Sequence, residues 1–318
     1  MGYTKENGKK GRILMNKVYD MLIIGGGPGG YTAALYAARA GLSALVLEKL
    51  AAGGQMVETP QIDNYPGFAE GIDGYTLGQQ MRENAEKFGA QTRFAEVTKL
   101  TLEGELKIAE TPEGTFYGKT VVIATGAGPK YLGVPGEREF HGRGVHYCAA
   151  CDGMFYRGKT VVVVGGGNTA AADALLLSRV AKKVILVHRR ETLRASRVYH
   201  KPLQELENVE FRWNSEVQEI KSGQILLRDV HTGEVSALQC DGVFVGIGRQ
   251  PATNLVKDTV KLDEQGYILS GESTVTNIPG VFAVGDVRTK ALRQIVTAVA
   301  DGAASVHQAE DYLAKLAG

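Results

Sequence analysis

Residues 21–30 read MLIIGGGPGG and decide the fold, and residues 161–170, VVVVGGGNTA, repeat their pattern. In each copy an apolar run predicts a buried strand, and the Ala- and Leu-rich segment after the glycines predicts a helix. Glycines at such a turn let the backbone approach a pyrophosphate at the helix N-terminus, where free N–H groups and the helix dipole favour anions. Two such turns predict an α/β fold with two Rossmann-like dinucleotide-binding domains.

The residue that ends the second strand of each unit distinguishes the two nucleotides. Glu48 ends the first unit, and a carboxylate there accepts hydrogen bonds from a ribose 2′-hydroxyl and repels a 2′-phosphate. His188 stands at this place in the second unit and is followed by Arg189, Arg190 and Arg194, whose guanidinium groups suit a phosphate. We therefore expect NADP(H) in the second site, although arginines can also form a solvated strand end.

A later segment favours FAD over NAD in the first site. Residues 276–286, TNIPGVFAVGD, predict a turn and a short apolar strand that ends at Asp286. A carboxylate at a strand end is well placed to accept hydrogen bonds from a sugar-like chain. Asp286 could also cap the helix that follows, which is compatible with this role.

A close cysteine pair, Cys148-Ala-Ala-Cys151, precedes the second fingerprint and is followed by Asp152. If the pair opens a helix, the N-terminus of that helix lowers the thiol pKa and stabilises a thiolate. Asp152 is then placed to exchange a proton with it. A zinc half-site is the alternative, but zinc needs four ligands, and beyond the pair there are only a lone Cys240 and two nearby imidazoles. Cys240 itself is expected to be a small buried apolar residue.

Taken together and in order, the motifs resemble those of low-molecular-weight thioredoxin reductases over nearly the whole chain from Tyr19 onward. The matching segments are GGQ at 53–55, NYPGF at 64–68, ATGA at 124–127, CAACDG at 148–153, HRR at 188–190 with Arg194, GIG at 246–248, GDV at 285–287 and RQ at 293–294. The resemblance implies electron flow from NADPH to FAD, then to a redox-active Cys148–Cys151 disulfide, and finally to thioredoxin. Asp152 would be the proton donor and acceptor; which cysteine attacks the partner stays open.

The resemblance also assigns the cofactor contacts. The FAD contacts would be Gly25, Gly27, Pro28, Gly30, Glu48, Gly54, Gln55, Asn64, Asp286, Val287, Arg293 and Gln294. The NADPH contacts would be Gly165, Gly167, Asn168, Thr169, Ala170, His188, Arg189, Arg190 and Arg194. One departure is AAADA at 170–174, where the family leads us to expect glutamate; we expect it to alter helix packing near the cofactor and not the catalysis.

The motifs divide the chain into a leader (1–17), a first part of the FAD domain (18–127), an inserted NADPH domain with the cysteine pair (128–250) and a second part of the FAD domain (251–318). The irregular residues 53–74 suit wrapping a flavin, a helix is expected over 77–88, and residues 246–251 are expected to form a turn. The resemblance also implies a rotation of one domain against the other, and the Gly-flanked crossings near Gly126 and Gly248 are its expected hinges.

Composition narrows the setting. The 318 residues suffice for two domains, and 44% hydrophobic with 22% charged residues is typical of a soluble globular protein. A net charge of +1 gives no support to nucleic acid or lipid partners, and no apolar run reaches the length of a membrane span. The polar leader fails as a secretory signal and is expected to be mobile, with Met15 a possible natural start. We expect a cytoplasmic protein, and the resemblance to thioredoxin reductases implies a homodimer through the FAD domains.

Three alternatives share some of these features. An enzyme of the same fold could reduce another redoxin, a peroxiredoxin system or a small disulfide. A ferredoxin- or flavin-type NADP reductase would use both nucleotide sites without a dithiol. A non-catalytic nucleotide-binding module would need neither the pair nor a flavin that NADPH bleaches.

Overall fold

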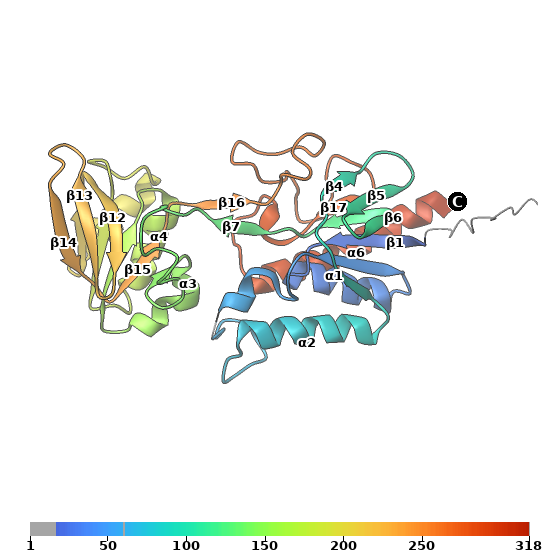
Figure 1. The fold of residues 1–318 in the computed structure, drawn as a ribbon, viewed down its shortest axis with the longest axis horizontal. Helices are drawn as coiled ribbons and strands as arrows, with labels where there is room; N and C mark the ends of the chain where they lie inside the picture. Colours follow the sequence, from blue (N-terminus) through green and yellow to red (C-terminus); the bar gives the residue numbers. More distant parts are fainter. Residues whose placement is uncertain (1–16, 60, 318) are drawn as a thin grey trace, which may run out of the picture.

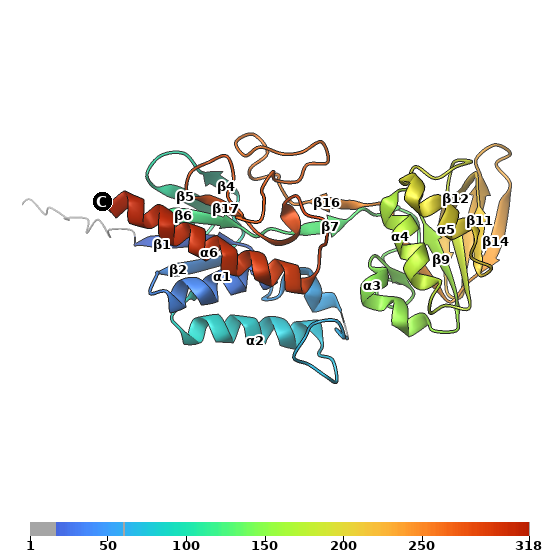
Figure 2. The same ribbon diagram turned by 180° about the vertical axis from the view of Figure 1, so that it is seen from behind.

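The computed structural model describes residues 17–59 and 61–317. Figures 1 and 2 show two lobes that are joined by two strands, β7 (Ala127–Pro129) and β16 (Arg249–Pro251). These strands pair antiparallel, so the chain leaves the first lobe and returns to it along one ribbon. The predicted domain boundaries fall at this ribbon, and the division into domains stays a prediction. The predicted leader lies outside the described residues, apart from its last residue.

The first lobe contains a seven-stranded sheet in the order β3-β2-β1-β6-β5-β4, with β17 paired to β6. Its strands are β1 (Val18–Ile24), β2 (Ala44–Glu48), β3 (Gln91–Phe94), β4 (Lys99–Thr101), β5 (Lys107–Thr111), β6 (Gly114–Ile123) and β17 (Val281–Ala283). Its helices are α1 (Pro28–Arg39), α2 (Gly74–Lys87), α6 (Ile295–Ala317) and the short 3-10 helices η1 (Gly54–Glu58) and η4 (Gly285–Val287). The neighbouring strands β3, β2, β1, β6 and β17 pair parallel, which requires long crossover connections, whereas β5 and β4 pair antiparallel.

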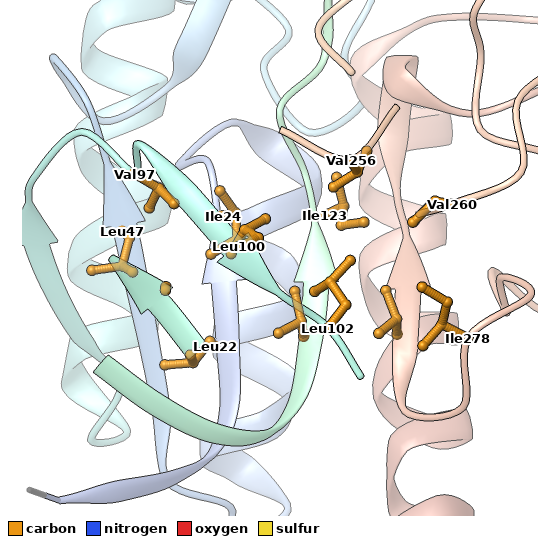
Figure 3. Packing of buried hydrophobic residues seen from close by; sticks show 14 of the residues in the cluster. Leu22, Ile24, Leu47, Val97, Leu100, Leu102, Ile123, Val256, Val260 and Ile278 are labelled. Atoms are coloured by element: carbon orange, nitrogen blue, oxygen red, sulfur yellow. The ribbon is translucent and has the colours of Figure 1, made fainter. Parts of the chain in front are cut away.

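Strand β1 is buried on both faces, which explains its continuous apolar run. Leu22 and Ile24 face a core that includes side chains from residues 97–102 and 256–278 (Figure 3). Met21 and Ile23 face the opposite core, which is built with alanines of α1 and with α6. The first fingerprint therefore lies at the end of a strand whose position is fixed from both sides.

The second lobe repeats this architecture. Its five-stranded parallel sheet has the order β11-β10-β9-β15-β8, and an antiparallel sheet β12-β13-β14 lies beside it. The strands are β8 (Val145–His146), β9 (Thr160–Val164), β10 (Lys183–Val187), β11 (Val209–Arg212), β12 (Ser215–Lys221), β13 (Gln224–Asp229), β14 (Val235–Gln239) and β15 (Gly242–Val245). The helices are α3 (Ala149–Asp152), α4 (Asn168–Leu177), α5 (His200–Gln204) and the 3-10 helices η2 (Gly153–Tyr156) and η3 (Arg197–Tyr199). The α/β fold class is confirmed.

Four local expectations differ from the structure. The helix expected over 77–88 begins earlier, at Gly74, because the Asp73 carboxylate caps it by accepting a hydrogen bond from the Thr76 N–H. The stretch 53–74 contains η1, although it was expected to lack regular elements. The expected turn over 246–251 ends in β16, since its pairing partner β7 lies far away in the sequence. Asp286 lies in η4 and does not cap α6, which begins at Ile295.

Candidate functional site at the two glycine turns and the cysteine pair

The first glycine turn connects β1 to α1. Gly25 has a φ of +105°, and a Cβ there would lie 2.5 Å from the Ala124 carbonyl oxygen. A Cβ on Gly30 would collide with the Gly25 carbonyl, whereas one on Gly27 would meet nothing within 4 Å. Helix α1 starts at Pro28 with no side-chain cap. The turn therefore has no room for a side chain at Gly25 or Gly30 but is open at Gly27. The N–H groups at the start of α1 are free to bind an anion.

The predicted ribose ligand lies beside this turn. Glu48 ends β2, and one of its carboxylate oxygens accepts a 2.6 Å hydrogen bond from the Gly26 N–H. The other oxygen accepts a 3.0 Å hydrogen bond from the Leu50 N–H. These bonds fix the carboxylate next to the glycines, where the sequence pattern predicted it.

The remaining predicted flavin residues come together from distant parts of the chain. Asn64 donates a 3.0 Å hydrogen bond to the side-chain oxygen of Gln294. Gln55 donates a 2.7 Å hydrogen bond to the Ala127 carbonyl. Arg293 donates to the Asp286 carbonyl at 3.3 Å, which places it against the end of β17. Asp286 is largely enclosed, and this burial raises the pKa of its carboxyl although three cations nearby oppose the rise.

A buried cluster that the sequence reasoning missed supports Asp286. Asp301 on α6 accepts hydrogen bonds from the Gly285 N–H at 2.8 Å, from Arg288 at 2.6 and 2.9 Å, and from Lys290 at 2.6 Å. Burial works to raise the pKa of Asp301, but these hydrogen bonds outweigh it, and the pKa is lowered. The cluster fixes the backbone immediately before Asp286.

The second glycine turn has the same design. A Cβ on Gly165 (φ +143°) would lie 2.6 Å from the Gly246 carbonyl oxygen, and one on Gly167 would meet nothing within 4 Å. Helix α4 begins at Asn168, again with no side-chain cap. The Asn168 side chain accepts a 2.7 Å hydrogen bond from the Ser196 N–H, which ties the helix start to the arginine segment.

The predicted phosphate ligands border this turn. Arg189, Arg190 and Arg194 are exposed, whereas His188 is buried against Gly166. Burial and the three guanidinium charges lower the pKa of His188, so its ring is neutral near pH 7. The backbone N–H of Arg194 donates a 2.7 Å hydrogen bond to the Gly166 carbonyl. Thr169 is exposed, and Ala170 is buried in contact with Gly165 and Gly246.

The cysteine pair opens α3, as predicted. Cys148 is the N-cap residue, and it forms a disulfide with Cys151. Both cysteines are half-buried. The Asp152 N–H donates a 3.1 Å hydrogen bond to the Cys148 carbonyl, which closes the turn around the disulfide. Cys240, in contrast, is a free thiol in the core of the second lobe, as expected. Within residues 17–59 and 61–317, no His, Cys, Asp and Glu side chains gather in a group suited to a metal ion.

Two partners of the pair were missed from the sequence. The Asp152 carboxylate lies 3.0 Å from Nδ1 of the buried His146, one of the two imidazoles near the pair in the sequence. Asp173 on α4 lies beside α3: burial raises the pKa of its carboxyl to about 6, although a hydrogen bond with the Ala149 backbone and the charge of Arg249 oppose the rise. The AAADA departure thus places a second carboxyl near the disulfide.

Comparison with known proteins decides the family. The model of the pyridine nucleotide-disulphide oxidoreductase family matches residues 19–302. The chain belongs to this family. It is 43% identical over 305 residues to a thioredoxin reductase of Bacillus subtilis (strain 168), an alignment that covers 94% of this chain and 96% of the relative. It is also 43% identical over 307 residues to a bifunctional thioredoxin reductase/thioredoxin of Mycobacterium leprae, covering 95% of this chain and 67% of that protein.

Solved structures of family members agree. The thioredoxin reductase from Streptococcus pyogenes MGAS5005 superposes with a TM-score of 0.88 at 44% identity and covers 94% of this chain and 99% of that one. The Lactococcus lactis thioredoxin reductase in its FR conformation gives a TM-score of only 0.67 at 41% identity, covering 93% and 99%. The resemblance to thioredoxin reductases is therefore confirmed, and this family member is an oxidoreductase.

Proposed function

We propose that this chain is an NADPH-dependent thioredoxin-disulfide reductase. The single observation that carries the proposal is the half-buried Cys148–Cys151 disulfide with Asp152 beside it, in the same chain as two uncapped glycine turns. A nucleotide-binding module or a ferredoxin-type NADP reductase has no use for such a pair. The names of the relatives point to thioredoxin as the disulfide substrate.

The first turn fits FAD. Space outside Gly27 leaves room for a pyrophosphate, Glu48 offers a carboxylate to a ribose, and Asp286 offers one to the ribityl chain. Gln55, Asn64, Arg293 and Gln294 would contribute the remaining contacts. When bound, FAD would accept hydride from NADPH and pass two electrons to a disulfide, which is chemistry that no side chain of this protein supplies.

The second turn fits NADPH. The open side of Gly167 and the uncapped start of α4 suit a pyrophosphate, and three exposed arginines suit a 2′-phosphate. His188, neutral and buried, adds no charge of its own. Replacing Arg189 and Arg190 by glutamine should weaken NADPH at least about tenfold and leave NADH nearly unchanged. Equal losses for both nucleotides in a fluorescence titration would contradict the assignment.

The domain division at 18–127, 128–250 and 251–318 is part of the proposal. A rotation of one lobe against the other would let the nicotinamide and the disulfide reach the same flavin in turn. Gly126 (φ +73°) and Gly248 (φ +106°) flank the ribbon, and a Cβ on either would meet at most one atom within 4 Å. The unequal TM-scores of two relatives at similar identity support a variable lobe arrangement.

The remaining predictions concern the cellular setting. A homodimer through the first lobe, and a cytoplasmic location, follow from the resemblance alone. Across the part of the chain that the structure describes, no helix combines the length and apolar character needed to span a membrane. Sedimentation equilibrium of the purified, flavin-loaded chain tests the dimer, since a mass near that of one chain would exclude it.

The decisive experiment is NADPH oxidation by the flavin-loaded protein with and without a thioredoxin, in parallel with Cys148→Ser. Turnover that requires thioredoxin and disappears in the variant supports the proposal. Flavin bleaching by NADPH without thioredoxin-dependent turnover would mean that another redoxin, a peroxiredoxin system or a small disulfide is the substrate. Turnover that survives in Cys148→Ser would rule out the dithiol relay.

A further inference from the structure

A chain of three polar side chains runs from Asp152, the residue after Cys151, into the interior of the second lobe. Asp152 Oδ2 lies 3.0 Å from His146 Nδ1, and His146 Nε2 lies 2.7 Å from the Tyr156 hydroxyl. The exposed fraction of the Asp152 side chain is 16%, and that of His146 is 6%. Asp152 is therefore the member that faces outward, and the other two are held behind it.

The packing around His146 fixes the ring. His146 ends β8 and pairs in register with Phe244 of β15, on whose ring it stacks at 5.3 Å between centroids. The Tyr156 ring packs edge-on against both rings. Gly242 leaves space for Tyr156, because a Cβ there would collide with the tyrosine ring. Burying two polar side chains in an apolar core is costly unless each is hydrogen-bonded, and the hydrogen bond between His146 and Tyr156 meets this requirement for both.

The hydrogen bonds determine the tautomer. An ionised carboxylate only accepts, so His146 Nδ1 carries the proton that Asp152 accepts. Burial first, and then the neighbouring acidic groups Asp152, Cys240 and Asp241, raise the pKa of Tyr156 to about 12, so the phenol keeps its proton near pH 7. In that tautomer Nε2 can accept a hydrogen bond from the Tyr156 O–H, which holds the ring with Nδ1–H aimed at Asp152.

We propose that His146, backed by Tyr156, is a positioning residue for proton transfer at the Cys148–Cys151 pair. The inference rests on the proposed function in taking this pair as the reacting disulfide. His146 Nδ1–H would hold one carboxylate oxygen of Asp152, which leaves the other free for the thiol. When the reduced pair attacks a protein disulfide, the S–H bond of one cysteine breaks and its proton moves to Asp152.

The rest of the step conserves atoms and electrons. The thiolate sulfur forms a new S–S bond with one sulfur of the external disulfide. The other sulfur of that disulfide leaves with the electron pair of the broken S–S bond, and Asp152 returns the proton to it. No further oxidant or reductant is needed, and Asp152 ends as the carboxylate that His146 holds.

The test follows the reaction of the thiol pair in the absence of nucleotide and of thioredoxin. Protein reduced with dithiothreitol and desalted is mixed with the chromogenic disulfide dithiobis(nitrobenzoate), and the fast thiol reaction is followed from about pH 5 to about pH 9, which spans carboxyl, imidazole and thiol titration. The titratable groups near Asp152 are His146, Tyr156 and Asp173, with Cys240 and Asp241 behind Tyr156. Labelling followed by mass spectrometry identifies Cys148 and Cys151 as the reacting thiols.

His146→Phe preserves an aromatic ring against Phe244 but removes the donor. We expect a rate about tenfold lower near neutral pH, within the range seen when a partner of a working residue is removed. Its pH profile should differ in shape from that of the wild-type protein, because the Asp152 carboxylate has lost its hydrogen-bond donor. His146→Asn, which keeps an N–H donor near Nδ1, should recover most of the rate, and Tyr156→Phe should show a smaller loss.

Tyr147→Phe is the matched control. Tyr147 lies next to Cys148 in the sequence, and its hydroxyl donates a 3.0 Å hydrogen bond to Glu137. The variant should leave the rate and the profile unchanged. The proposal is overturned if His146→Phe matches the wild-type profile, or if Asp152→Asn reacts as fast as wild type. Circular dichroism checks that each variant is folded. A protein that reacts as expected here but fails to turn over thioredoxin would refute the proposed function and leave this inference standing.

Discussion

The guanidinium of Arg249 donates a 2.8 Å hydrogen bond to the side-chain oxygen of Gln55, a residue 194 positions earlier in the chain. It also donates to the Ala127 carbonyl at 3.2 Å and lies 3.8 Å from the Asp286 carboxylate. Arg249 belongs to the ribbon between the lobes, yet its side chain lies among the proposed flavin contacts. One residue thus connects the crossing point to the cofactor site.

Replacing this guanidinium should weaken flavin binding. Arg249→Met keeps the length of the side chain but removes its hydrogen bonds and charge. Because Arg249 opposes the burial that raises the Asp286 pKa, that pKa should rise further in the variant. We expect FAD to bind about tenfold more weakly, with a larger loss near pH 6 than near pH 8. Fluorescence titration with FAD at the two pH values measures both effects. The control is Arg228→Met, which removes an ion pair with Glu216 on the exposed sheet and should bind FAD normally.

The Asp301 cluster should dominate the stability of the first lobe. Asp301→Asn leaves Arg288 and Lys290 enclosed without a counter-charge, and we expect the free energy of unfolding to fall by about 3 kcal/mol. Since the folded-state pKa of Asp301 is lowered, its stabilising effect is present above the unfolded pKa and is lost as the pH falls through the folded value. Urea unfolding should therefore show the difference near pH 7 and a smaller one below about pH 4.

The control for this variant is Glu96→Gln, which breaks an ion pair with Lys49 in which both side chains are more than half exposed. It should cost less than about 1 kcal/mol, because solvent screens such pairs. Equal losses of unfolding free energy in the two variants would mean that the buried Asp301 cluster stabilises the protein no more than an exposed ion pair does.

Asp173 should make the second lobe less stable at alkaline pH than at acidic pH. Its pKa is raised to about 6, so any stabilisation is complete below the unfolded pKa and is lost as the pH rises through about 6. Asp173→Asn removes the charge, and it should raise the free energy of unfolding by about 1 to 3 kcal/mol near pH 7.5 with no gain near pH 4. The same gain at both values would show that the carboxyl is not buried in its charged form.

The two glycine turns offer a comparison of neighbouring residues. A methyl group on Gly27 or Gly167 would meet nothing within 4 Å, and neither residue has a positive φ. The variants Gly27→Ala and Gly167→Ala should therefore keep the wild-type melting temperature. Because the methyl group would occupy the path of a pyrophosphate, FAD and NADPH respectively should bind at least about tenfold more weakly. Gly166→Ala should instead destabilise the fold, since its Cβ would collide with the His188 ring. Calorimetry with and without nucleotide separates the two effects.

The parts of the fold that depend on local residue patterns could be predicted from the sequence. Strands β1 and β9 follow from apolar runs, the helices after them from composition, and the tight turns from their glycines, of which Gly25 and Gly165 have a positive φ. The start of α2 was missed although its signal, the cap residue Asp73, was visible in the sequence. The strand β16 could not be found in this way, because it exists only through its pairing with β7.

The candidate site likewise combines residues that a local sequence pattern predicts with residues that only tertiary packing brings together. Glu48 could be placed from the end of its strand, and the structure puts its carboxylate beside the glycines. The contact of Asn64 with Gln294 joins residues 230 positions apart, and only the family resemblance suggested that both belong to one site. His146 was visible in the sequence, but nothing local showed that the strand β8 would turn its ring toward Asp152. Tertiary contacts of this kind are set by the packing of whole elements.

The ribbon of β7 and β16 has a consequence for modular construction. The Ala252 N–H donates a 2.9 Å hydrogen bond to the Gly126 carbonyl, so the two ends of the intervening segment lie side by side. Insertions between such adjacent ends disturb the host little, because the host's own backbone path is nearly continuous across them. The second lobe can thus be regarded as a cassette: splicing Gly126 to Ala252 through a short turn would excise it and leave the first sheet with all of its strands. Evolution or engineering could exchange one such cassette for another without redesigning the first lobe.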